Sequence, residues 1–218
     1  SEAARDRLLK QFETASLKGF GVDHLQLAIV ASGAILHYLD ITQHTGLSHI
    51  TSLACIERDT SVRLDRFTVR NLELFHPIGE GGKSLLDIID RTVSPMGARL
   101  LRRWMSFPLK DAAEINKRLD IVEYFFKYPD DREELRRSLE HVGDLERLTA
   151  KIAAGRVSPR ELVQVRTALS MIGPIKRLCE ESGEPALRSI GEQLNPCDTI
   201  AERIAREIVD DAPAALNR

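Results

Sequence analysis

The residue run most suggestive of chemistry is Gly79–Ser84, which reads GEGGKS. Phosphate-binding loops of the G-x-x-x-x-G-K-[S/T] type wrap phosphates with backbone N–H groups, reach them with the Lys and hold Mg²⁺ with the Ser or Thr. Gly82, Lys83 and Ser84 match the end of that pattern, but the first glycine is replaced by Pro77, which has no N–H and a fixed φ. We therefore favour a plain loop in which Ser84 caps a following helix.

Other residue types that perform chemistry do not form a recognisable site in the sequence. Three histidines lie close along the chain, two are isolated, and the three cysteines show no C-x-x-C spacing: His37, His44, His49, His76, His141, Cys55, Cys179 and Cys197. The acidic pairs lie in charged helical stretches typical of solvated faces and exposed ion pairs: Glu133-Glu134, Glu180-Glu181 and Asp210-Asp211. We therefore predict no catalytic, cofactor-binding or metal-binding residues, and no disulfide framework.

Two basic clusters are candidates for phosphate contact. The first cluster lies on one predicted helix and consists of Arg99, Arg102 and Arg103. The second lies on both sides of a predicted turn and consists of Lys151, Arg156, Arg160 and Arg166. The favoured interpretation is that these side chains lie along helix faces and pair with acids, namely Asp144, Glu146 and Glu161. Trp104 and Phe107 are expected to anchor a helix–helix contact rather than to stack on bases. No individual nucleic-acid-binding residue is predicted.

Composition excludes several classes of protein. The 218 residues are 43% apolar and 29% charged, with a net charge of −2, whereas an independent duplex-DNA binder usually carries a clear positive excess. No apolar run approaches the ~20 residues of a membrane helix, so no membrane partner is expected. The odd, unpatterned cysteines favour a reducing cytoplasmic compartment. The ends, at Ser1 and Arg218, suggest an excised piece of a longer protein.

The elements that would position these residues are mainly helical. Apolar residues at three-to-four spacing predict helices over about 3–13 and 23–43, with small residues around Gly33 allowing close backbone packing. Alternating β-branched residues predict one small antiparallel sheet near residues 50–75, with a turn at Asp59-Thr60 and a last strand ending at Phe75. From about Ser84 onward we expect an array of antiparallel helices.

Helix boundaries are marked by capping residues. Ser94-Pro95, Asp111 and Ser158-Pro159 each combine an N-cap residue with a proline or a following acid, and Asn195-Pro196 is expected to repeat this arrangement. Gly155 and Gly183 are stop signals. The apolar stripes of these helices include Leu101 and Trp104, where we expect loss of burial to cost ~3–5 kcal/mol.

Several longer strings resemble one family. Residues 63–74, RLDRFTVRNLEL, resemble the segment that opens the core domain of the MutS family of DNA mismatch repair proteins, and residues 90–104, DRTVSPMGARLLRRW, resemble another run of that family. Residues 142–148 (VGDLERL) and 158–162 (SPREL) are similar to its later helices, and residues 19–22 and 36–39 to the end of its connector domain. The strings occur in family order over nearly the whole chain.

The resemblance implies a domain plan and a function. Residues 1–46 would be the C-terminal end of the connector domain, 47–110 the start of the core domain and 111–218 core and lever helices that stop before the DNA clamp. The chain would be a non-catalytic segment linking the ATPase to the clamp and to the mismatch-reading domain, with the helices after 111 as levers and 84–107 as their packing base. ATP and Mg would act elsewhere in the full-length DNA-dependent ATPase. Its partners would be mismatched duplex DNA, a second subunit of a homodimer and a MutL-type protein, in the bacterial cytoplasm at the nucleoid.

Two other functions stay open at this point. An autonomous helical DNA-binding domain would use the arginine clusters and would bind duplex with a steep salt dependence. A nucleotide-binding enzyme would use the Gly79–Ser84 loop and would lose nucleotide affinity on Lys83→Ala.

Overall fold

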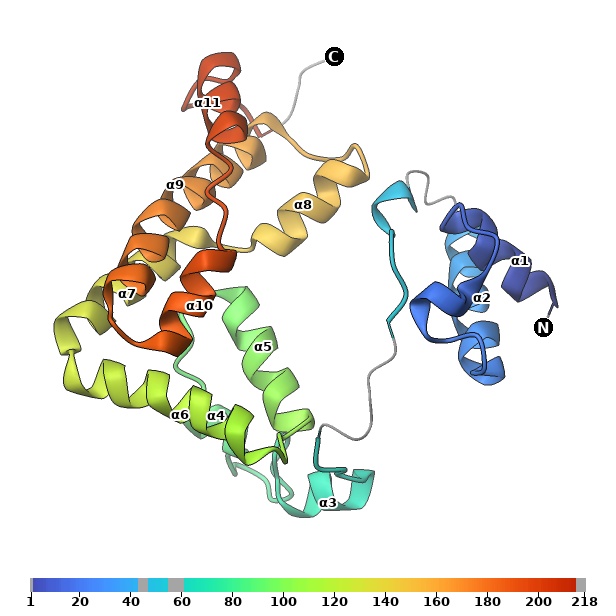
Figure 1. Ribbon diagram of the computed structural model, residues 1–218, viewed down its shortest axis with the longest axis horizontal. Helices are drawn as coiled ribbons and strands as arrows, with labels where there is room; N and C mark the ends of the chain where they lie inside the picture. The colour runs from blue at the N-terminus through green and yellow to red at the C-terminus, as the bar shows by residue number, and fades with distance from the viewer. Residues whose placement is uncertain (1, 43–46, 55–60, 215–218) are drawn as a thin grey trace. The chain divides into compact units, whose positions relative to one another are not determined.

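The computed structural model describes residues 2–42, 47–54 and 61–214, which fold as helices and connecting segments (Figure 1). The α-helices are α1 (Glu2–Gln11), α2 (Gln26–Ile41), α3 (Arg66–Asn71), α4 (Leu85–Ile89), α5 (Pro95–Ser106), α6 (Ala112–Lys127), α7 (Pro129–Val142), α8 (Leu145–Ala153), α9 (Pro159–Glu181), α10 (Pro185–Gln193) and α11 (Asp198–Glu207). Short 3-10 helices span Leu17–Phe20 and Leu47–His49. The chain divides into two compact units, 1–57 with 149–157, and 58–148 with 158–218.

The first unit is built on the pairing of α1 with α2, which lie side by side in Figure 1. Leu8, Leu17 and Ile29 are almost completely buried in its core. Gly33 allows the two helices to approach closely, since a Cβ at this position would lie 2.5 Å from the Cβ of Ala4. This confirms the close packing expected in the middle of the second helix.

The second unit is organised around α9, which packs against α7, α10 and α11 (Figure 1). One buried cluster joins α9 to α7 and α10 through residues such as Ala168 and Leu187, and another joins it to α8 and α11 through Val165 and Ile204. Although α9 has 23 residues, no helix in the described part of the chain is long and apolar enough to cross a membrane. The predicted mainly helical array is confirmed.

Capping residues set the helix starts, as the sequence predicted. The side chains of Ser94 and Asp111 accept hydrogen bonds from backbone N–H groups of α5 and α6. Ser158 and Glu161 form a capping box at the start of α9, which satisfies two N–H groups that the helix itself leaves unpaired. Gly155 and Gly183 adopt positive φ after α8 and α9, as expected of stop residues.

The predicted sheet near residues 50–75 is not present in the described residues of that range. Asp59-Thr60, the expected turn, lies outside the described residues; the only bridge among residues 61–75 is an isolated antiparallel one between Ser61 and Leu109. In place of a strand, α3 begins after Asp65, whose Oδ1 accepts a hydrogen bond of 2.7 Å from the backbone N–H of Thr68. An N-cap at this position outweighs the short alternation of β-branched residues, because strand propensity depends on a partner strand to pack against.

The start of α11 also differs from the prediction. Asn195 was expected to cap a helix with Pro196 in its first turn, but α11 begins three residues later, at Asp198. Asn195 Oδ1 instead accepts a 2.9 Å hydrogen bond from the N–H of Cys197, which adopts a left-handed conformation with φ 53°. Asn side chains commonly bond the backbone two residues on in this way, which makes a turn rather than a cap.

Candidate functional site

Arg99 on α5 joins two motifs that are 45 residues apart in the sequence. Its Nη1 and Nη2 donate to the two carboxylate oxygens of Asp144, at 3.0 and 2.7 Å. Its Nε and Nη2 also donate to Glu146 Oε2, at 3.0 and 2.5 Å. Asp144 precedes α8 and Glu146 lies in its first turn, so this Arg99–Asp144–Glu146 triad ties α5 to the junction of α7 and α8.

The guanidinium and the two carboxylates of the triad stabilise one another's charged forms. Hydrogen bonds from Arg99 are the main cause that lowers the pKa of the Asp144 carboxyl below its ordinary 3.8, and the Arg147 backbone N–H adds to the effect. The two carboxylates in turn raise the pKa of the Arg99 guanidinium. Asp144 is partly covered while Arg99 and Glu146 are exposed, so the triad orients two elements more than it stabilises a core. The predicted pairing of basic-cluster side chains with acids such as Asp144 and Glu146 is confirmed for Arg99.

The remaining members of the basic clusters have other roles. Arg102 lies over the ring of Phe75, with 4.5 Å from its Cζ to the ring centroid. Arg166 pairs with Asp210 at 2.6 Å. Lys151 and Arg156 belong to the first compact unit and Arg160 and Arg166 to the second, so the second cluster is not a single group within one unit.

Trp104 makes the helix–helix contact that the sequence predicted. The guanidinium of Arg118 on α6 lies over its ring, 3.7 Å from the centroid, in a cation–π contact between α5 and α6. The predicted burial is wrong, however, because Trp104 is 41% exposed and α5 has no buried residue. Phe107, which ends α5, is 45% exposed. We therefore expect Leu101→Ala or Trp104→Ala to cost only ~1–2 kcal/mol in this chain, below the range expected for full burial.

The Gly79–Ser84 loop leads into helix α4 and ends at its N-cap residue, Ser84. Ser84 is fully buried, accepts from the Asp87 N–H and donates its hydroxyl to Asp87 Oδ2 at 2.7 Å, while Asp87 Oδ2 also accepts from the Ser84 N–H. The predicted N-cap is thus confirmed as a full capping box on the five-residue helix α4. The hydroxyl that would hold Mg²⁺ in a phosphate-binding loop is committed to Asp87, which favours a structural role.

Ser84→Ala should destabilise the second unit by about 1–2 kcal/mol, because it removes the hydroxyl that caps α4 and takes from the Asp87 N–H its hydrogen-bond acceptor. Lys83→Ala, at the exposed neighbour, is the matched control and should change the free energy of unfolding by less than ~0.5 kcal/mol. Urea denaturation measures both. Saturable micromolar ATP binding that Lys83→Ala abolishes would contradict this assignment.

The other candidate residues are the acidic pairs, the histidines and the cysteines. Glu133, Glu180 and Asp210 form ion pairs with Arg132, Lys176 and Arg166, as expected for exposed carboxylates. His141 contacts the Arg137 carbonyl oxygen at 2.8 Å, and no metal-binding group of three or more His, Cys, Asp or Glu occurs among residues 2–42, 47–54 and 61–214. Cys179 and Cys197 are free thiols, and burial raises the pKa of Cys179. His44 and Cys55 lie outside the described residues.

Sequence reasoning missed a polar group among α6, α7 and α9. The Tyr124 hydroxyl donates to Asp131, and burial together with this bond raises the pKa of Tyr124 to about 12. Both residues line a cavity of about 310 Å³ with Arg177 and Glu181 from α9. No motif marks this pair, because the contact depends on the angle at which α6 meets α7.

Comparison with known proteins matches both parts of the chain. The family model described as MutS domain III matches residues 67–218, and that described as MutS domain II matches residues 1–51. The chain is 59% identical to the DNA mismatch repair protein MutS of Parabacteroides distasonis over all of its length, and 60% and 45% identical to those of Bacteroides thetaiotaomicron and Flavobacterium psychrophilum over 99%. It spans about a quarter of the length of these relatives, 25% in each case.

Proposed function

Because the chain belongs to the MutS family, we propose that it works as a non-catalytic link that carries movement between the ATPase and the DNA-gripping parts of a mismatch repair protein. Its matched regions are domains II and III of that family. Within this link, residues 84–107, with α4 and α5, would be the packing base and the helices from α6 onward the levers. The predicted boundaries at residues 46/47 and 110/111 are part of this proposal.

The observation that carries the proposal is the Arg99–Asp144–Glu146 triad. Coupling over long distances requires rigid elements whose relative orientation is controlled at a few contacts. The triad is such a contact, because four hydrogen bonds from one guanidinium join α5 to the start of α8. It also joins the MGAR and DLER strings, which lie within the segments that resemble the family.

The whole protein's activity follows from the same proposal. Its partners would be mismatched duplex DNA, a second copy in a homodimer and a MutL-type protein, and it would act in the bacterial cytoplasm at the nucleoid. ATP and Mg²⁺ would bind in an ATPase domain outside these 218 residues. The relatives' name, DNA mismatch repair protein, supports the assignment to DNA repair.

A chimera tests the proposal. This chain replaces the matching quarter of the Bacteroides thetaiotaomicron relative, and ATP-triggered release from a mismatched duplex with blocked ends is measured with and without Arg99→Gln. Loss of the triad should weaken the coupling between ATP and DNA by about 2-fold to 30-fold while mismatch affinity without nucleotide stays within about 2-fold. Arg99→Lys should recover only part of the coupling, because an ammonium group cannot make the two-pronged contact with Asp144.

Arg203→Gln, which removes an exposed pair with Glu207 on α11, is the control and should leave coupling intact. In the 218-residue chain, Arg99→Gln should lower Tm by about 1–3 °C near neutral pH. Because the folded-state pKa of Asp144 lies below 3.8, its stabilising contribution is complete above 3.8 and disappears as the pH falls through that lower value. Coupling that is unchanged in the Arg99→Gln chimera would refute the proposed role of the triad.

A further inference from the structure

Residues 61–110 differ in charge from the rest of the chain. They contain nine Lys and Arg against five Asp and Glu, a net charge of +4, whereas the whole chain has −2. Six of these cations have exposed side chains on or beside α3 and α5: Arg63, Arg66, Arg70, Arg102, Arg103 and Lys110. We call these six residues the α3–α5 basic surface.

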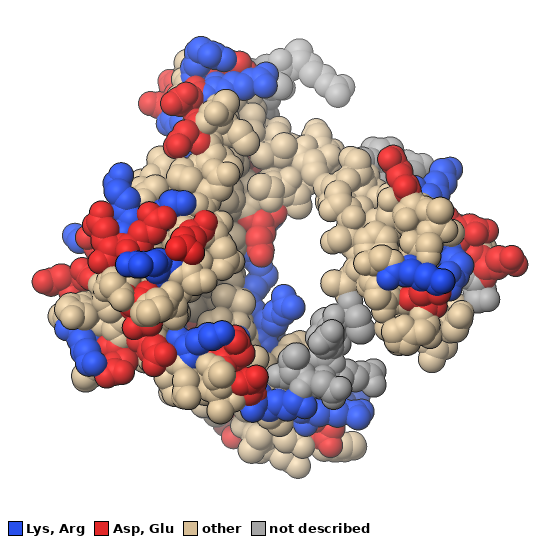
Figure 2. Space-filling view, in the orientation of Figure 1, with Lys and Arg blue, Asp and Glu red and all other residues tan. Residues whose placement is uncertain are grey.

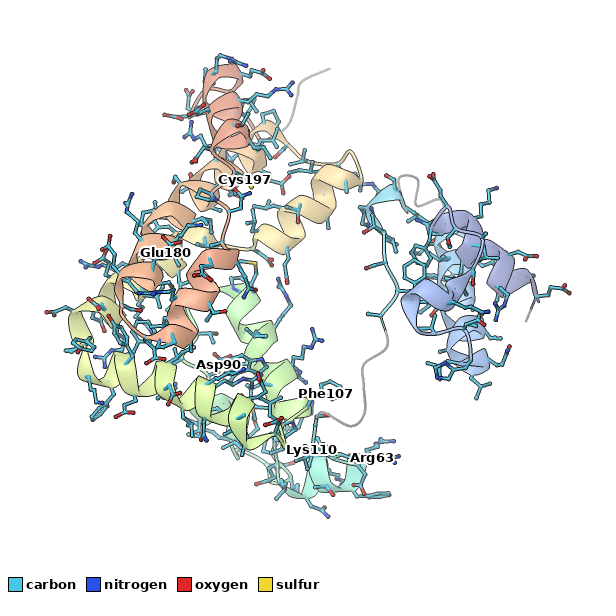
Figure 3. The ribbon with its side chains drawn as sticks, in the orientation of Figure 1. Arg63, Asp90, Phe107, Lys110, Glu180 and Cys197 are labelled. Carbon is cyan, nitrogen blue, oxygen red and sulfur yellow. The ribbon has the colours of Figure 1, made fainter. Side chains whose placement is uncertain are left out.

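Tertiary contacts bring the six residues into one part of the second unit. The bridge between Ser61 and Leu109, with the hydrogen bond from Val62 N–H to the Pro108 carbonyl, sets the segment of Arg63 beside that of Lys110. Figure 3 shows Arg63, Phe107 and Lys110 as neighbours. Arg102 reaches back over Phe75, which ties the C-terminal half of α5 to the loop after α3. Figure 2 shows Lys and Arg side chains over α3 and next to it.

Nearby acids bond backbone N–H groups rather than these cations. Asp65 caps α3 and Asp111 caps α6, Asp87 accepts from the Ser84 N–H, and Glu73 accepts from the Ile78 N–H. Among the described residues, no ion pair joins an acid to any member of the α3–α5 basic surface, in contrast to Arg99 on the same helix. The charge of this surface therefore remains available to an external anion.

We propose that the α3–α5 basic surface contacts the phosphate backbone of duplex DNA without reading its sequence. Five of the six cations are arginines, whose planar groups bind phosphate through two parallel hydrogen bonds. The six cations are all exposed and are distributed over two helices and the segments beside them, an arrangement that suits phosphates spaced along a duplex more than a single short peptide. Six contacts are too few to hold duplex at physiological salt, so this contact is additional to the transmitting function proposed above.

The test uses the 218-residue chain and a fluorescent, fully paired 30-base-pair duplex, with anisotropy measured between about 20 and 200 mM salt. We expect weak binding at low salt with a slope of log K against log salt of about −5, from six contacts. The triple variant Arg66→Gln, Arg70→Gln, Lys110→Gln should reduce the magnitude of the slope by about 3 and the affinity at 50 mM salt by about tenfold.

The control triple variant is Lys117→Gln, Lys127→Gln, Arg203→Gln, which makes the same change in net charge at exposed cations that have ion-pair partners. It should bind duplex within about 2-fold of the parent chain. Equal losses in both triple variants, or no duplex binding at 20 mM salt by the folded parent chain, would overturn the proposal. Binding of a polyglutamate peptide, lost in the first triple variant, without duplex binding would overturn it in favour of an acidic protein partner. Circular dichroism establishes that each variant is folded, and neither result alters the chimera test of the triad.

Discussion

Gly33→Ala is expected to destabilise the first unit by about 2–3 kcal/mol, although alanine is the better helix former. The added Cβ would lie 2.5 Å from Ala4 Cβ, 2.7 Å from its Cα and 2.8 Å from its carbonyl oxygen. Two of these atoms are backbone, so α1 must move away from α2 and open the core around Leu8 and Ile29. Hydrogen exchange in peptides from residues 2–11 and 26–41 should accelerate by about 30-fold to 150-fold.

Gly173→Ala is the matched control for this prediction. Gly173 also lies within a helix, α9, and a Cβ there meets nothing within 4 Å apart from its chain neighbours. This substitution should therefore change the free energy of unfolding by less than ~1 kcal/mol, because the helical preference for alanine is opposed by crowding between its Cβ and the ring of Pro174, the next residue. If Gly33→Ala behaved like Gly173→Ala, the close approach of α1 and α2 would be wrong.

Leu187→Ala is expected to destabilise the second unit by about 3 kcal/mol. Leu187 on α10 is 3% exposed and belongs to the cluster that includes Ala168, Ile175 and Cys179 on α9. Truncation removes apolar contacts and leaves a cavity that helices on several sides cannot easily fill. The free energy of unfolding from urea denaturation measures the loss, and hydrogen exchange in α9 and α10 locates it.

Ile190→Ala, three residues further along α10, gives the comparison. Ile190 is 43% exposed, so its truncation should cost less than ~1 kcal/mol. The difference between the two variants reports how α10 is oriented on α9. Equal losses would mean that α10 presents another face to the core.

The Arg99–Asp144–Glu146 triad gives the family motifs a physical meaning. Taken one at a time, MGAR and DLER are short charged strings at helix starts, and each is compatible with simple solvation. In the structure one guanidinium satisfies two carboxylates from the other string. Loss of Arg99 would remove the guanidinium that two carboxylates share, which is why we expect coupling to depend on this residue more than on exposed pairs such as Arg203–Glu207.

Local chemistry made the helix starts predictable. Ser84, Ser94, Asp111 and Ser158 each act within three residues of their own position, so their sequence neighbours contain the information needed. The family resemblance could be recognised for a similar reason, since its strings are contiguous. The failures arose where two local signals competed: Asp65 capped a helix within an alternating stretch, and Asn195 made a turn instead of a cap.

The sequence alone predicted the helical class, most helix starts, the family and the N-cap position of Ser84. Only the tertiary structure decided which charged groups meet. Arg99 forms ion pairs, whereas no ion pair involves Arg103 among the described residues. The partly exposed ring of Trp104 contacts the guanidinium of Arg118. Cations from α3, α5 and the segment before α6 lie on one surface. The physical reason is the separation along the sequence over which each interaction acts. Capping acts within one helical turn, whereas ion pairing and burial depend on helix packing angles that are set by contacts distant in the sequence.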